Sequence, residues 1–189
     1  GIMMIVGSAI LAFDPHKFFF LGISFTVIGT GFFKPNISTM VGALYKTNDT
    51  RRDAGFSLFY SGINVGALLG GYACVYIGKS YSWNVAFGLA GVVMIISLIT
   101  FIFTQKSLST IGVSPLLGVE KSKRKLYEYL IYAGTILAIP LIMTLVSNPQ
   151  YTDIFMYTIG PLTLLYLFYE MRSFTLQENK KLIAALVFI

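Results

Sequence analysis

Apolar residues occur along the chain in blocks of about 20, and short polar segments separate the blocks. A helix of that length spans the ~30 Å hydrocarbon layer of a membrane. The blocks lack the alternation of a membrane barrel, and a backbone in lipid must satisfy its own hydrogen bonds, so the pattern predicts helices. We therefore expect an all-α, polytopic transmembrane bundle. The predicted spans cover residues 1–13 (partial), 18–45, 55–77, 84–104, 126–146, 154–172 and 182 onward (partial).

Composition supports this interpretation. Hydrophobic residues make up 56% of the 189 residues and charged residues only 12%, whereas a soluble domain has roughly 25% charged residues. We expect the sequence to begin and end inside helices, because the first apolar stretch is too short to cross a bilayer alone. Cys74 is the single cysteine and His16, in a predicted loop, is the single histidine. We therefore expect no disulfide, no metal, no catalytic residues and no enzymatic activity.

The segments between the spans alternate in charge. The three segments on one side of the predicted membrane, 14–17, 78–83 and 147–153, together carry only Lys17 and Lys79. By the positive-inside rule the other side, with eleven basic residues, is cytoplasmic. This topology accounts for the net charge of +6, so we expect no nucleic-acid partner. The eleven residues are Lys46, Arg51, Arg52, Lys106, Lys121, Lys123, Arg124, Lys125, Arg172, Lys180 and Lys181.

One charged residue lies inside a predicted span. Lys34 is 11 residues before Tyr45 and 16 after Phe18, which places it roughly 16 Å from the inner end of its helix. A lysine at that depth costs about 2.5 to 3.5 kcal/mol and normally faces a water-filled pathway. The alternatives are a misplaced span or a side chain that snorkels to the interface, but its stem reaches only about one helical turn.

No carboxylate inside the predicted spans can pair with Lys34. All eight Asp and Glu residues lie in loops or at helix ends. We therefore expect the partner of the ammonium group to be an acid on another helix of the protein, the carboxylate of a substrate, or each of these in turn.

The residues around Lys34 predict an irregular helix. Pro35 removes one backbone donor and crowds the carbonyl of Gly31, so we expect a kink, with close helix packing at Gly31. The alternative is a purely structural kink, because Gly and Pro are common in membrane helices.

The next span presents two different faces. Tyr60 and Asn64 lie four residues apart on one side and predict a ligand-binding face. Gly62, Gly66 and Gly70 form a small-xxx-small run on the other side and predict close packing against another helix. The alternative for Tyr60 and Asn64 is an interhelical hydrogen bond without a ligand.

Three stretches of the sequence resemble a known family. Residues 29–45 (GTGFFKPNISTMVGALY), 49–57 (DTRRDAGFS) and 59–70 (FYSGINVGALLG) are similar to the signature regions of the proton-dependent oligopeptide transporter (POT) family, of the major facilitator superfamily. The third stretch matches the family motif Phe-Tyr-x-x-Ile-Asn-x-Gly. The resemblance is to the bacterial type of member.

The resemblance implies a domain organisation. Residues 1–104 would run from the end of the third helix to the sixth helix of the N-terminal six-helix bundle. Residues 105–125 would form a cytoplasmic linker, 126–172 an inserted transmembrane hairpin, and 173–189 a cytoplasmic loop with the start of the seventh helix.

The resemblance also implies a function. We expect proton-coupled symport of di- and tripeptides by alternating access in a bacterial inner membrane, by a monomer with no cofactor and the proton as coupling ion. Lys34 would pair with the peptide carboxylate or with a first-helix acid, Asn64 would bond the peptide backbone, and Tyr60 would line the pocket. The family's proton-binding carboxylates lie outside the matched residues. The alternatives are transport of nitrate or another small anion on the same fold, and a membrane scaffold that transports nothing.

Overall fold

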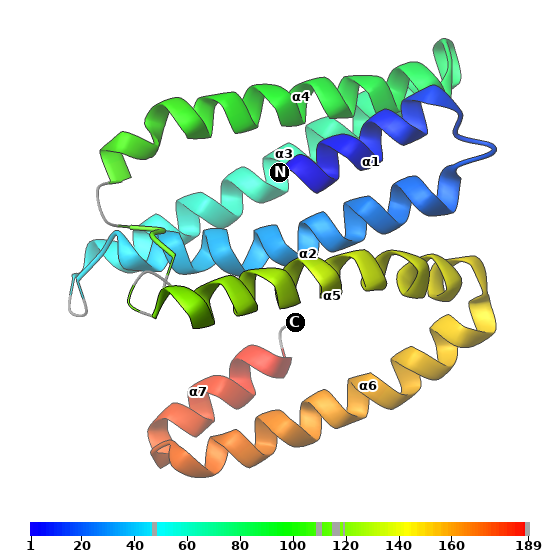
Figure 1. Ribbon diagram of the computed structural model, residues 1–189. Coiled ribbons are helices and arrows are strands. Elements are labelled where there is room, and N and C mark those ends of the chain that lie inside the picture. The colour runs from blue at the N-terminus through cyan, green and yellow to red at the C-terminus, as the bar shows by residue number, and fades with distance from the viewer. Residues whose placement is uncertain (47–48, 109–110, 115–117, 119, 188–189) are drawn as a thin grey trace. The chain divides into compact units, whose positions relative to one another are not determined.

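The computed structural model describes residues 1–46, 49–108, 111–114, 118 and 120–187, and its regular elements in these ranges are helices (Figure 1). The chain divides into two compact units, Gly1–Met143 and Thr144–Ile189. The elements are α1 (Ile2–Phe13), α2 (Phe19–Ala43), α3 (Arg51–Ser80), α4 (Trp83–Thr104), the 3-10 turn η1 (Gln105–Leu108), α5 (Lys121–Ser147), α6 (Pro149–Glu170), the 3-10 turn η3 (Met171–Ser173) and α7 (Leu176–Val187).

Each predicted span corresponds to one helix, but several helices begin earlier than predicted. α3 begins at Arg51, α5 at Lys121, α6 at Pro149 and α7 at Leu176, four to six residues before the predicted spans. The first turns of α3, α5 and α7 carry charged side chains, and α6 begins with a proline at its first helical position. Hydropathy marks the apolar part of a helix, so it misses such turns.

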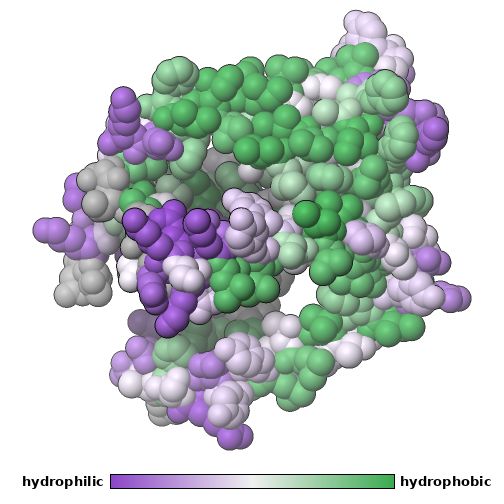
Figure 2. Space-filling view, viewed as in Figure 1, coloured by the Kyte–Doolittle hydropathy of each residue, from purple (hydrophilic) through white to green (hydrophobic). Residues whose placement is uncertain are grey.

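Among the described residues, four helices are long and apolar enough to cross a membrane: α3, α4 with η1, α5, and α6 with η3. α2 has 25 residues but lies outside this set, because Lys34, Pro35 and Asn36 interrupt its apolar sequence. Apolar side chains cover the visible face of α4, whereas hydrophilic ones gather near helix ends (Figure 2). Such an apolar exterior is typical of a protein surrounded by lipid.

α1 lies between α2 and α4 and packs against both (Figure 1). Small residues allow the close approach to α2. A Cβ atom added at Gly7 would lie 2.6 Å from the Gly22 carbonyl oxygen, and one at Gly29 would lie 2.9 Å from the Met4 nitrogen. Leu11 and Ile28 are buried in this region. Van der Waals contact between closely spaced backbones therefore holds α1 and α2 together.

Side-chain hydrogen bonds stabilise this packed region where α1 ends and α4 begins. Asn84 at the start of α4 donates to the carbonyls of Ala12 and Phe13, at 2.9 and 3.2 Å, and so satisfies the C-terminal end of α1. The carboxylate of Asp14 accepts hydrogen bonds from the backbone N–H groups of His16 and Lys17, both at 3.0 Å. These bonds order the turn between α1 and α2.

The predicted linker is described only in part. Gln105–Leu108 forms η1, and Gly112 has a positive φ of 81°. Pro115 lies outside the described residues. The division of the chain into an N-terminal bundle part, linker, hairpin and seventh helix stays a prediction.

Candidate functional site

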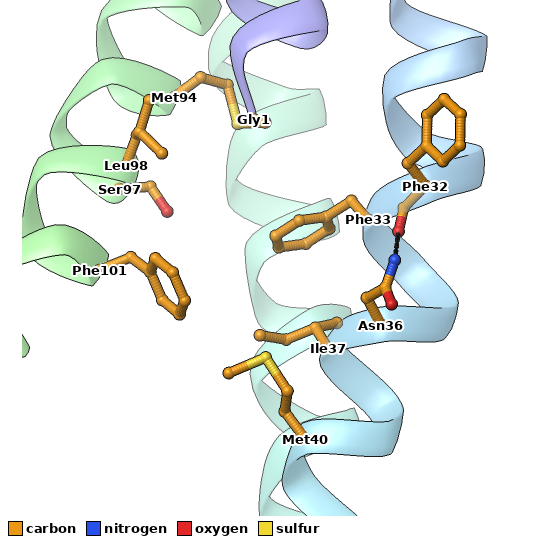
Figure 3. Close-up of a pocket in the computed structure, with 10 residues that line it drawn as sticks. All are labelled: Gly1, Phe32, Phe33, Asn36, Ile37, Met40, Met94, Ser97, Leu98 and Phe101. Carbon is orange, nitrogen blue, oxygen red and sulfur yellow. Dashed lines mark hydrogen bonds between the residues drawn. The ribbon is translucent and has the colours of Figure 1, made fainter. Parts of the chain in front are cut away.

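α2 continues without interruption through Pro35. Side chains next to the proline bond backbone oxygens of the same helix: the Asn36 amide donates to the Phe32 carbonyl at 2.6 Å (Figure 3), and the Thr39 hydroxyl donates to the Pro35 carbonyl at 2.9 Å. Such bonds let side chains of the helix donate to its backbone carbonyl oxygens near a proline, where water is not available inside a membrane. The kink predicted at Pro35 stays a prediction.

Lys34 and Tyr60 line one cavity, which α1, α2 and α3 form together. Its volume is about 620 Å³. A cavity of this size lies within the range of small-molecule sites, ~300 to 1,000 Å³. The structure thus brings together two of the three predicted binding residues. The lining consists of Met4 from α1, of Thr30, Phe33, Lys34, Pro35, Ile37 and Ser38 from α2, and of Phe59, Tyr60 and Ile63 from α3.

The ammonium group of Lys34 is the charged group of this cavity and has no ion pair. Neither ion pair found among the described residues, Arg51 with Asp49 and Arg124 with Glu128, involves Lys34. Most of the other lining side chains are apolar. Lys34 itself is exposed, so its positive charge is accessible to an anionic ligand that enters the cavity.

Thr30 and Ser38 are cavity residues that the sequence analysis missed. They lie four residues before and four residues after Lys34, so one face of α2 presents hydroxyl, ammonium and hydroxyl groups in succession. The same four-residue spacing that identified Tyr60 and Asn64 could have identified this stripe. The hydroxyls offer hydrogen bonds to a ligand held by Lys34.

Tyr60 lies in an aromatic group. Its ring stacks with Phe56, with centroids 6.5 Å apart and planes 27° apart, and it contacts Phe59 at 5.5 Å and 60°. Phe33, Phe59 and Ile63 complete an apolar wall on the cavity. The cavity can therefore hold a molecule with one negatively charged end and an apolar part.

Asn64 lies one turn beyond Tyr60 on α3 and is not part of the lining of this cavity. Its predicted contact with a ligand stays a prediction.

The predicted packing glycines have no neighbour in the described part of the chain. A Cβ atom added at Gly31, Gly62, Gly66 or Gly70 would meet no atom within 4 Å. The close approaches of this unit occur instead at other glycines, such as Gly7 and Gly22. Packing at the predicted positions stays a prediction that concerns segments other than those described.

A second hollow lies between α2 and α4, next to Gly1 (Figure 3). Its volume is about 450 Å³, and it is lined by apolar side chains such as Phe33, Met40 and Leu98, with the polar atoms of Asn36 and Ser97. It contains no charged side chain, and the Asn36 amide is already bonded to the backbone. It therefore offers no comparable site for a charged ligand.

Known sequences similar to this chain are transporters. The sequence profile of the POT family matches residues 1–147. A peptide transporter of Yersinia enterocolitica is 45% identical over 93 residues, which are 49% of this chain and 18% of that protein. Dipeptide and tripeptide permease A of Serratia proteamaculans is 32% identical over 117 residues, 61% of this chain and 23% of that protein. The chain thus spans about a fifth of the length of these relatives.

Solved structures show the same fold. A peptide transporter POT in complex with sulfate is 31% identical, with a TM-score of 0.64 over 98% of this chain and 40% of that one. A mutant of such a transporter in complex with alafosfalin is 31% identical, with a TM-score of 0.70 over 98% and 39% of the two chains. These matches confirm the predicted fold class, an all-α transmembrane bundle of the major facilitator type. The chain is therefore part of an integral membrane protein.

Proposed function

The chain belongs to the POT family, and from this premise we propose that its protein is a proton-coupled symporter of di- and tripeptides. It works by alternating access in a bacterial inner membrane. The relatives named as peptide transporters support the substrate class, and their bacterial sources support the location. The alternating spans and charged loops of the sequence are consistent with a multi-pass transporter.

The observation that carries this proposal is the cavity shared by Lys34 and Tyr60. Lys34 binds the C-terminal carboxylate of the peptide, and at another stage of the cycle it pairs with an acid on a helix outside this chain. Tyr60 lines the pocket and bonds a polar group of the peptide, and Asn64 bonds the peptide backbone. The unpaired Lys34 and the exposed Tyr60 in one cavity support these roles.

Energetics favour a carboxylate as the group that Lys34 receives. Lys34 is exposed in the structure, so its ammonium group is accessible to a ligand, and an ion pair with additional hydrogen bonds would offset the desolvation that a bound ligand imposes. Thr30 and Ser38 stand on the same face to supply such bonds. A zwitterionic peptide satisfies the cation and presents its side chain to Phe33, Phe59 and Ile63.

The test replaces Lys34 by Ala in the complete transporter and measures proton-driven uptake of a labelled dipeptide into proteoliposomes. We expect uptake to fall at least tenfold, because a hydrogen bond to a charged group contributes about 1.5 to 3 kcal/mol. Lys79→Ala, at the end of α3 and away from the cavity, is the matched control and retains uptake. Undiminished uptake by Lys34→Ala would refute the assignment, and uptake that persists after a protonophore collapses the gradient would refute proton coupling.

Transport of a small inorganic anion is the second candidate. It is favoured by the unpaired cation of the cavity and by the relative solved in complex with sulfate. Uptake and competition separate the two functions. A peptide transporter accumulates a labelled dipeptide and unlabelled peptides inhibit this uptake, whereas an anion transporter accumulates labelled nitrate and peptides do not inhibit it.

A further inference from the structure

α2 and α3 meet at a corner beside the Lys34 cavity. The aromatic ring of Tyr45, just after α2, lies against Gly55 in α3, where an added Cβ atom would come within 2.6 Å of its Cε2 atom. On the neighbouring face, Phe56 of α3 lies against Gly42 of α2, where a Cβ atom would be 3.4 Å from the ring. Each helix thus offers a glycine to receive an aromatic ring of the other, and we call these four residues the corner.

The segment that joins the two helices at the corner is held by local bonds. Asp49 accepts hydrogen bonds from the Arg51 backbone N–H at 2.9 Å and from its guanidinium at 2.8 and 3.1 Å. The Arg51 side chain holds the pKa of the Asp49 carboxyl at about 2, below its usual 3.8. The carboxylate therefore remains ionised throughout the physiological range and keeps the start of α3 capped.

The corner is connected to the cavity by a row of side chains on one face of α3. The guanidinium of Arg52 lies over the Phe56 ring at 6.0 Å, and the Phe56 ring stacks with Tyr60 at 6.5 Å. Residues 52, 56 and 60 are four apart, so they stand above one another along the helix. The ring that sits against Gly42 of α2 is therefore the same ring that supports Tyr60.

Beyond the corner, α2 and α3 diverge. α2 makes extensive contact with α1, at Gly22 and Gly29 in its first half, but little with α3, and residues of both α2 and α3 line the cavity. Lys34 lines that space from α2 and Tyr60 lines it from α3. Their separation therefore depends on the angle at which the two helices leave the corner.

We propose that the corner formed by Gly42, Tyr45, Gly55 and Phe56 sets the width of the cavity and holds Tyr60 opposite Lys34. These are positioning residues, and their effect on transport rests on the proposed function. Phe56 orients the Tyr60 ring by stacking against it. The contact of Tyr45 with Gly55 sets the distance between α2 and α3. A methyl group at position 55 would overlap the end of the Tyr45 side chain, and we expect the helices to move apart rather than the ring to turn away.

The test is a double-mutant cycle in the complete transporter. The variants are Gly55→Ala, Tyr45→Ala and both together. The background lacks Cys74 and every other cysteine of the complete protein, and it carries spin labels at positions Phe32 and Leu68, which are exposed in this chain. Pulsed EPR reports the separation of α2 and α3, and dipeptide uptake reports KM and kcat. We expect Gly55→Ala to lengthen the distance and to raise KM about tenfold or more with a smaller change in kcat, because displaced binding groups cost affinity.

The double variant shows whether the effect of Gly55→Ala depends on the Tyr45 ring. Because Tyr45→Ala removes the ring that an alanine at position 55 would meet, the pair should restore the distance and most of the KM. Gly134→Ala on α5, where an added Cβ meets nothing within 4 Å, is the control for the effect of a glycine replacement and leaves both readouts unchanged. An unchanged distance in Gly55→Ala, or no recovery in the double variant, would overturn the proposal.

Two other outcomes can also be interpreted: a Gly55→Ala variant that does not fold, and a wild-type protein that carries no peptide. If Gly55→Ala does not fold, Phe56→Leu provides the test, because leucine keeps an apolar side chain at Gly42 but loses the stack with Tyr60. This variant should raise KM. An unchanged KM would overturn the role of Phe56. If the wild-type protein carries no peptide but Gly55→Ala still changes the distance, the corner stands and the proposed function fails.

Discussion

The first unit has two glycine-rich regions, and they differ in whether another helix packs against them. On α1 and α2, Gly7, Gly22 and Gly29 lie in contact, with backbone atoms so close that no Cβ would fit. On α3, Gly62, Gly66 and the glycines that follow face open space in the described part of the chain. The regular four-residue run, which is the stronger sequence signal for packing, is therefore the one without a neighbour here.

The difference divides the unit into a close-packed part and an open part. α1 packs extensively against both α2 and α4, whereas α2 and α3 make few contacts, among them those of the corner. At its other end α3 contacts α4, where the Trp83 ring lies so close to Gly78 that an added Cβ would come within 2.6 Å. The cavity with Lys34 and Tyr60 lies where the open part faces the packed part, so one wall of the site is firmly held.

The largest effect is expected from breaking the packed interface. Gly7→Ala would place a methyl group 2.6 Å from the Gly22 carbonyl oxygen, which belongs to the backbone and cannot rotate away. We expect a loss of about 1 to 3 kcal/mol of stability, as for other overpacked cores. The thermal unfolding midpoint of the complete protein in detergent measures it. Gly160→Ala on α6, which has open space, is the control; equal midpoints for the two variants would contradict the close contact.

A smaller effect is expected from the open glycine run, and it would sharpen the comparison. Gly70 belongs to the predicted packing run and Gly71 does not, although both face open space in this chain. If another segment of the protein packs on the run, Gly70→Leu lowers the unfolding midpoint while Gly71→Leu changes stability by less than about 0.5 kcal/mol. Equal midpoints for the two leucine variants would show that the run packs against nothing.

The smallest effect is expected at the exposed cap of the corner. A lowered pKa means that the ionised Asp49 stabilises the fold above pH 3.8, and that this contribution is lost as the pH falls from 3.8 towards about 2. Hydrogen exchange of the Arg51 amide, corrected for the intrinsic rate, should therefore be the same at pH 7 and pH 5.

Variants of Asp49 separate its hydrogen bond to the Arg51 backbone from its ion pair with the Arg51 side chain. Asp49→Ala removes the acceptor of the Arg51 amide and should speed its exchange. Asp49→Asn keeps an acceptor oxygen and loses only the ion pair, so its exchange should stay close to wild type, because exposed ion pairs contribute little. Faster exchange in Asp49→Asn would show that the charge itself matters.

The sequence predicted the helices well and the site in part. Every apolar block became a helix, because a segment in lipid has few alternatives to helical hydrogen bonding. Lys34 stood out because a charge inside an apolar block is costly. Thr30 and Ser38 were missed because hydroxyl groups are common in membrane helices and become informative only beside a charged neighbour.

The sequence alone determined that this chain is a set of membrane helices with one lysine inside an apolar span and a family signature. Only the tertiary structure decided which glycines touch, and that Lys34 shares a cavity with Tyr60 while Asn64 lies outside its lining. The physical reason is that helix formation in lipid depends on local composition, whereas the choice of contacts depends on the shapes of two helices together. A run of small residues permits close packing on any helix, but the partner surface decides where it occurs.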